Sequence, residues 1–95
     1  IATLFAPNAF TPNNDGLNDV FIPKGVFLGI KDYSLQVWNR WGEMIYETND
    51  VEEGWNGQVS NNGDQVPQGV YVYQFQYTEP RGKKINNKGQ ILSKA

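Results

Sequence analysis

Residues 70–78, VYVYQFQYT, alternate between two sets of side chains, and this pattern constrains the fold more than any other feature of the chain. Successive side chains of a β-strand point to opposite faces. The run therefore predicts a strand with one aromatic face turned toward a core and one mixed face turned away from it. The aromatic residues at every second position are Tyr71, Tyr73, Phe75 and Tyr77. No segment of the chain shows a sustained helical period.

Residues 33–39, YSLQVWN, predict a second strand, which places Tyr33, Leu35 and Val37 on one face. Trp38 interrupts the pattern because it falls on the polar side. Residues 40–42 then turn the chain, since Gly42 is free to adopt a positive φ. Residues 43–47 (EMIYE) return as the second strand of a hairpin.

Shorter strands are predicted at residues 3–6 and 85–93, and turns at 61–63, 67–69 and 79–82. Residues 8–23 contain three turn clusters and are expected to hold little regular structure. The ten glycines and five prolines fit short strands joined by tight turns. We therefore expect an all-β fold, an immunoglobulin-like antiparallel β-sandwich of about seven strands. Residues 1–95 should form a single domain.

The absence of cysteine and histidine restricts the chemistry of the chain. It rules out a disulfide and a thiolate metal site, and it removes the commonest general base and zinc ligand. No serine or lysine lies in a recognisable nucleophile motif, so we expect no catalytic residue, no cofactor and no enzyme activity. Because Ile1 begins directly on an apolar strand, we expect the chain to be a domain of a longer protein whose targeting leader lies outside it.

Charge is unevenly distributed along the chain. Residues 1–80 hold ten acidic and three basic side chains, a balance of −7, whereas residues 81–95 hold five basic and no acidic ones, a balance of +5; together these give the net charge of −2. The basic segment is either a solvated hairpin or a surface for an acidic partner or a membrane. Nucleic-acid binding is not expected, because most of the domain is acidic. The basic residues are Arg81, Lys83, Lys84, Lys88 and Lys94.

Oxygen ligands are densest at Asn13, Asn14, Asp15, Asn18 and Asp19. The spacing does not fit an EF-hand, because aligning the glycine of this loop leaves no carboxylate at the first and last loop positions. A different cation site remains open, but we favour hydrogen bonds from these short side chains to the nearby backbone.

The three tryptophans admit two interpretations. Exposed aromatics on a β-sandwich can stack on sugars, which would make the domain a carbohydrate-binding or surface-binding module. Alternatively, Trp41 and Trp55, each beside a turn glycine, cap the ends of the core, and this second interpretation is preferred for a domain of this size.

Four segments together resemble the gliding-motility-associated C-terminal domain, the type B sorting domain of the type IX secretion system in Bacteroidota. They are FAPNAFTPNNDGLNDVF (5–21), YSLQVWNRWGEMIYE (33–47), GWNG (54–57) and PQGVYVYQFQY (67–77). The resemblance implies a domain at the C-terminus of a secreted or cell-surface cargo, often an adhesin or an enzyme. It also implies recognition by the outer-membrane translocon together with a PorP/SprF-like outer-membrane protein. Taken alone, the domain is expected to be a monomer.

The resemblance marks candidate sorting residues in four groups. The first loop contains Phe10, Pro12, Asp15, Gly16, Asn18 and Asp19. The hairpin turn contains Asn39, Arg40, Trp41 and Gly42. The core group contains Trp55, Gly57, Gly69, Tyr71 and Tyr73. The basic group contains Lys83, Lys84, Lys88 and Lys94.

Two of these expectations are specific enough to test against a structure. Arg40 is predicted to clamp loop carbonyls or carboxylates, or else to contact the translocon directly. The basic last hairpin, expected to end in a weakly paired strand, is a candidate for recognition by β-strand addition.

Overall fold

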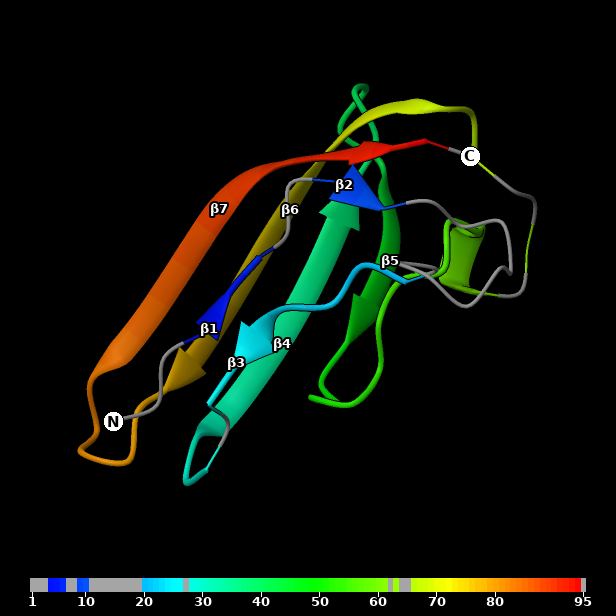
Figure 1. Cartoon of the computed structure of the whole chain (residues 1–95). Coiled ribbons are helices and arrows are strands. Elements are labelled where there is room, and N and C mark those ends of the chain that lie inside the picture. Colours follow the sequence, from blue (N-terminus) through cyan, green and yellow to red (C-terminus); the bar gives the residue numbers. More distant parts are fainter. Residues whose placement is uncertain are drawn as a thin grey trace.

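The computed structural model describes residues 4–6, 9–10, 20–26, 28–61, 63 and 66–94, and within them the chain forms seven strands and one short 3₁₀ helix (Figure 1). The all-β prediction is confirmed. No helix in these residues is long and apolar enough to cross a membrane. The elements are β1 (Leu4–Phe5), β2 (Ala9–Phe10), β3 (Lys24–Gly25), β4 (Lys31–Trp38), β5 (Met44–Thr48), η1 (Val59–Asn61), β6 (Gly69–Thr78) and β7 (Lys84–Ser93).

The strands form an open sandwich of two unequal sheets. The large sheet has the order β2-β7-β6-β4-β5, and β1 pairs with β3 in a second, two-stranded sheet. The succession β7-β6-β4-β5 corresponds to the G-F-C-C′ order of an immunoglobulin sheet. The hydroxyl of Tyr71, near the start of β6, donates to the carbonyl of Pro67 at 2.6 Å, which is the tyrosine-corner contact of that fold. The immunoglobulin-like prediction is therefore confirmed.

The expected antiparallel pairing is confirmed for the described strand pairs except one, because β2 pairs with β7 in parallel. A parallel pair cannot be joined by a tight hairpin and needs a long connection. Here β2 and β7 lie near opposite ends of the sequence, so almost the whole domain serves as the connection. The sequence shows strand patterns but not the partner of a strand that is distant along the chain.

Residues 8–23 contain more regular structure than expected. Ala9–Phe10 form β2, and Phe21 forms an isolated bridge with Trp55, whose two backbone hydrogen bonds measure 2.7 and 2.9 Å. Both Phe10 and Phe21 are buried. Their backbone groups must therefore find partners inside the protein, and they find them in distant segments, at β7 for Phe10 and at Trp55 for Phe21.

The expectation of a weakly paired last strand is also wrong. β7 pairs with β6 over ten consecutive positions, from Gly69 opposite Ser93 to Thr78 opposite Lys84. The asparagines and the glycine of β7 lower its intrinsic strand preference, but ladder hydrogen bonds come from the backbone and a well-formed neighbour overrides that preference.

The core lies between the two layers, on the inner faces of β4, β5 and β6. The predicted alternation is confirmed in β4, where Tyr33, Leu35 and Val37 are buried, and in β6, whose valines point outward. The buried apolar residues are Leu4, Phe10, Phe21, Tyr33, Leu35, Val37, Ile45, Tyr46, Trp55, Val66, Tyr71, Phe75, Tyr77 and Ile91.

Gly89 of β7 lies beneath the ring of Tyr73 on the neighbouring strand. A Cβ at position 89 would lie 2.6 Å from the Tyr73 hydroxyl and 2.8 Å from Cζ. We predict that Gly89→Ala lowers the free energy of unfolding by about 1–3 kcal/mol, because the ring must move out of its packed position. Asn86→Ala, at an exposed position of the same strand, is the control. Equal urea midpoints for the two variants would contradict this packing.

Tyr33 is buried, and its hydroxyl has no hydrogen-bond partner among the described residues. Burial, together with the nearby Tyr46 and Asp50, raises the pKa of Tyr33 above its ordinary value of 10.0. The folded state then holds this proton more tightly than the unfolded state does. The stability it contributes is complete below about pH 10 and is lost as the pH rises further.

We predict that Tyr33→Phe reduces the alkaline loss of stability and is neutral or stabilising at pH 7, since it removes an unpaired buried hydroxyl. Urea unfolding between about pH 7 and 11 measures both effects. The variant retains part of the alkaline effect through Tyr46 and Tyr71, whose pKa values burial also raises. Parallel pH profiles for variant and wild type would contradict the assignment.

Candidate recognition surface

The β4–β5 hairpin turn is built around the side chain of Asn39. Its Oδ1 accepts hydrogen bonds from the backbone N–H groups of Trp41 and Glu43, both at 3.0 Å, and its Nδ2 donates to Glu43 Oε1 at 2.8 Å. The turn closes through Gly42 N–H to the Asn39 carbonyl at 3.1 Å, and Gly42 has φ 83°. The predicted turn is confirmed. The asparagine side chain fills the inside of the turn, so the residues that follow it project outward.

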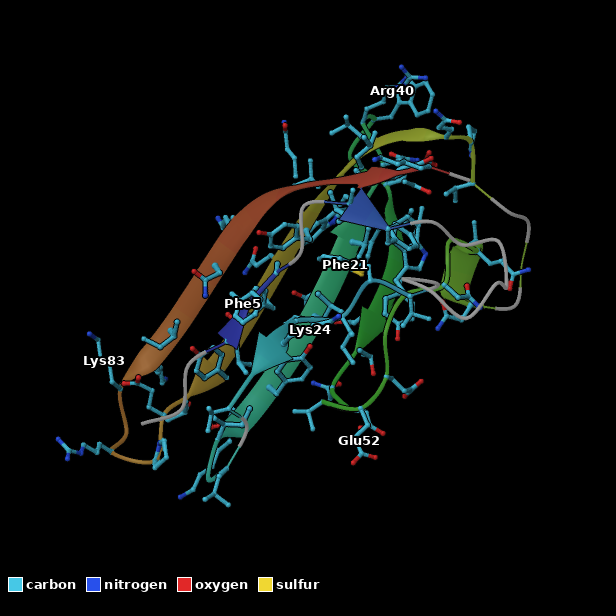
Figure 2. The ribbon with its side chains drawn as sticks, in the orientation of Figure 1. Phe5, Phe21, Lys24, Arg40, Glu52 and Lys83 are labelled. Atoms are coloured by element: carbon cyan, nitrogen blue, oxygen red, sulfur yellow. The ribbon has the colours of Figure 1, made fainter. Side chains whose placement is uncertain are left out.

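Arg40 and Trp41 form the tip of this hairpin. The guanidinium carbon of Arg40 lies 4.7 Å from the centroid of the Trp41 ring, a cation–π arrangement. Trp41 is 73 % exposed, so the expectation that it caps the core is wrong. Among the described residues Arg40 has no carboxylate within ion-pairing distance, and the stacking on Trp41 replaces the expected clamp as its observed contact. Figure 2 shows Arg40 projecting from the end of the large sheet.

The segment leading into β6 packs beside this tip. The N–H of Val66 donates to the Gly57 carbonyl at 2.8 Å, and the tyrosine corner ties Tyr71 to Pro67. Burial raises the pKa of Tyr71, and the positive charge of Arg40 partly opposes that shift, so the guanidinium acts on this phenol electrostatically. Two segments that are distant in the sequence therefore meet at one end of the sheet.

A groove of about 640 Å³ lies where they meet. We call it the Trp41 groove. Its rim carries the exposed apolar side chains of Trp41, Val59, Val70 and Val72. The lining residues are Asn39, Arg40, Trp41, Ile45, Val59, Val66, Pro67, Gln68, Gly69, Val70, Tyr71, Val72 and Gln90.

Sequence reasoning missed the contribution of the valines to this groove. It placed Val70 and Val72 on the outward face of β6 correctly, but it gave that face no role. The signal was present in the sequence, because two valines at outward positions are unusual on a face that water covers.

The aromatic candidates other than Trp41 belong to the core. The ring of Trp55 is fully buried and lies 5.2 Å from the rings of both Phe10 and Tyr71. Its Nε1 donates to the Gln58 carbonyl at 2.9 Å. Tyr73 is partly buried, and its ring centroid lies 5.1 Å from that of Phe21. The prediction that Trp55 belongs to the core is therefore confirmed.

Trp55 is carried by a loop that asparagine side chains hold in shape. Asn61 Nδ2 donates to the Gly54 carbonyl, and Asn61 Oδ1 accepts from the Asn56 N–H, both at 2.8 Å. Gly57 has φ 88°, a conformation that favours glycine. This local network allows an irregular loop to occupy part of the second layer.

The basic candidates are spread along the large sheet and do not form one cluster. Lys83 lies in the β6–β7 turn, Lys84 and Lys88 lie on β7, and Lys94 follows its end, where its N–H donates to the Phe10 carbonyl at 3.0 Å. Figure 2 shows Lys83 and Arg40 at opposite ends of the sheet. The Trp41 groove and the basic β6–β7 turn are therefore separate features.

The first-loop candidates Pro12, Asp15, Gly16, Asn18 and Asp19 lie outside the described residues, so the cation hypothesis for this loop stays a prediction. Within the ranges that the structure does describe, no three acidic side chains come together to hold a metal ion.

The described residues form an immunoglobulin-like sandwich with a solvent-exposed aromatic tip beside a groove. The chain matches the CHU_C Type IX secretion signal domain over residues 4–92, and it therefore belongs to that family. The match confirms the resemblance seen in the sequence. No curated protein matches the chain.

Family membership makes this chain a type IX secretion signal domain. The protein that carries such a domain is exported to the cell surface or the medium, and the domain interacts with the type IX machinery. A family of secretion signals is not a family of enzymes.

The surface position of Trp41 predicts a clear contrast between two tryptophans. Trp55→Ala should lower the free energy of unfolding by about 3–5 kcal/mol, because it leaves a large cavity in the core. Trp41→Ala should lower it by less than about 1 kcal/mol, the worth of an exposed cation–π contact. Urea unfolding followed by circular dichroism measures both changes. A large loss for Trp41→Ala would place this ring in the core after all.

Proposed function

We propose that residues 1–95 form one C-terminal sorting domain, which directs an exported cargo through the type IX outer-membrane translocon by protein–protein recognition. The observation that carries this proposal is the family match over residues 4–92. The proposed partner is a PorP/SprF-like outer-membrane protein that acts with the translocon. The domain acts as a monomer, and its cargo is an extracellular protein of a gliding member of the Bacteroidota, such as an adhesin.

The Trp41 groove supports recognition of the folded domain. Its two walls come from residues 39–41 and 66–72, so it exists only once β4, β5 and β6 have assembled. Tryptophan and arginine are the residues most enriched where protein interfaces concentrate their binding energy. An exposed pair of these at a hairpin tip fits a contact surface better than a structural role, since Asn39 already holds the turn.

Export of a reporter tests the proposal. The 95-residue chain is fused to a fluorescent reporter behind a periplasmic leader, in a type IX-competent strain and in a translocon-defective one. We expect export only in the competent strain. We expect Trp41→Ala to lower export by about tenfold, as for an interface hot spot. Phe5→Ala, which removes an exposed aromatic outside the groove, is the matched control.

Two outcomes would contradict this proposal. A folded fusion that stays in the periplasm, although the cargo's own partner protein is present, would reject the sorting role. Unchanged export of the Trp41→Ala variant would remove the groove from recognition and leave the sorting role standing.

The second candidate function is a carbohydrate-binding module, and it is favoured by one observation, the exposure of Trp41 beside a groove. Glycan arrays distinguish the two functions. The sorting proposal expects no saturable sugar binding, whereas saturable binding that Trp41→Ala abolishes would favour the module.

A further inference from the structure

The outer edge of β7 is open along most of its length. On one side β7 pairs with β6 at every position, but on the other side β2 covers only Leu92 and Ser93. No other described strand pairs with that side. Figure 1 shows β7 running along the border of the large sheet with β2 beside its C-terminal end. From Lys84 to Gln90 the border therefore consists of strand backbone with no neighbouring strand among the described residues.

The register identifies which backbone groups face outward. In an antiparallel pair, residues alternate between those that bond their direct partner and those that point their N–H and C=O groups away from it. The N–H of Glu79 donates to the Lys83 carbonyl at 2.8 Å, so that pair is of the bonded kind. Because bonded and outward residues alternate along the register from that pair, the outward N–H and C=O groups belong to Lys84, Asn86, Lys88 and Gln90.

A separate contact confirms this assignment. Lys94, which the same alternation also turns outward, donates its N–H to the Phe10 carbonyl of β2. The edge that β2 occupies beyond Leu92 is thus the same edge that stands open from Lys84 to Gln90. We call this open stretch, residues 84–90, the β7 edge.

The side chains along the β7 edge determine which strand it can accept. Lys84 and Lys88 are exposed and lie four residues apart, and residues 81–95 contain no acidic side chain. Antiparallel pairing of two copies centred on Asn86 would place Lys84 opposite Lys88 twice, and like charges in direct opposition are destabilising. An acidic strand would meet the opposite charge at both positions. The edge therefore disfavours a second copy in that register and favours an acidic partner.

We propose that the β7 edge binds an extended acidic segment of the protein that receives this domain, by addition of that segment as a strand beside residues 84–90. The segment carries carboxylates four residues apart, opposite Lys84 and Lys88. This inference rests on the proposed sorting function and specifies the chemistry of the partner. It also assigns to the lysines a selective role beyond keeping the edge from self-association.

Two synthetic peptides of about ten residues, the upper end of usual strand lengths, test the inference. Both alternate Thr and Val, and they carry either Glu or Lys at two positions four residues apart. We expect only the Glu peptide to bind the 95-residue chain. Its binding should slow hydrogen exchange at the amides of Lys84, Asn86, Lys88 and Gln90. No binding, or binding without this slowing, would overturn the inference and leave the lysines as simple protection of an edge.

Variants separate backbone pairing from charge. Asn86→Pro removes one outward N–H without touching the ladder to β6, and it should weaken binding of the Glu peptide by about tenfold. Asn86→Ala keeps the N–H and should bind as the wild type does. The double variant Lys84→Glu, Lys88→Glu leaves the backbone intact and should prefer the Lys peptide. Equal binding by the Pro and Ala variants, or an unchanged preference of the charge variant, would overturn the inference.

The export fusion keeps this inference distinguishable from the proposed function. If the wild-type domain is exported and folded Asn86→Pro is not, while Asn86→Ala is, both stand. If Asn86→Pro is exported as efficiently as the wild type, the strand-addition inference fails and the sorting role remains. If the wild-type domain is not exported, the sorting role itself fails, whatever the peptides do.

Discussion

The burial of Trp55 is the interaction on which the rest of the structure depends. This ring comes from an irregular loop, yet it packs against Phe10 near the N-terminus and against Tyr71 at the start of β6. The backbone N–H and C=O groups of Trp55 both form hydrogen bonds with the backbone of Phe21. A domain of this length buries a smaller fraction of its surface than a larger domain does, so one large ring that joins three distant segments carries much of the packing. The loop can take the place of regular strands in the second layer because asparagine side chains satisfy its backbone.

This arrangement separates the signature residues of the sorting family into two kinds. Phe10, Trp55 and Tyr71 are buried in the core of the sandwich, and their packing there accounts for their presence. Arg40 and Trp41 have no such explanation, because Asn39 already stabilises the turn that carries them. A signature that contains both kinds describes a domain that must first fold and then present a surface.

The large sheet offers two features of opposite character, an apolar groove with one arginine at one end and a basic border along β7. Both features involve β6 and β7. Val70 and Val72 of β6 and Gln90 of β7 line the groove, and Gln90 also belongs to the β7 edge. A partner that added a strand to β7 would therefore approach the groove from its side. The two surfaces are independent in chemistry but adjoin at Gln90, so one receptor can contact both.

The sequence alone determined the strand alternation, the hairpin turn at Gly42 and the family. These follow from local rules: period-two patterning in residues 33–38 and 70–78, and turn chemistry at glycine and asparagine, need no knowledge of distant partners. The tertiary structure decided what depends on distant pairing. It set β2 parallel to β7, buried Trp55 while exposing Trp41, and joined residues 39–41 to residues 66–72 in one groove. Two tryptophans beside turn glycines look alike in the sequence, because burial depends on which segments pack around a ring and not on the ring's own neighbours in the chain.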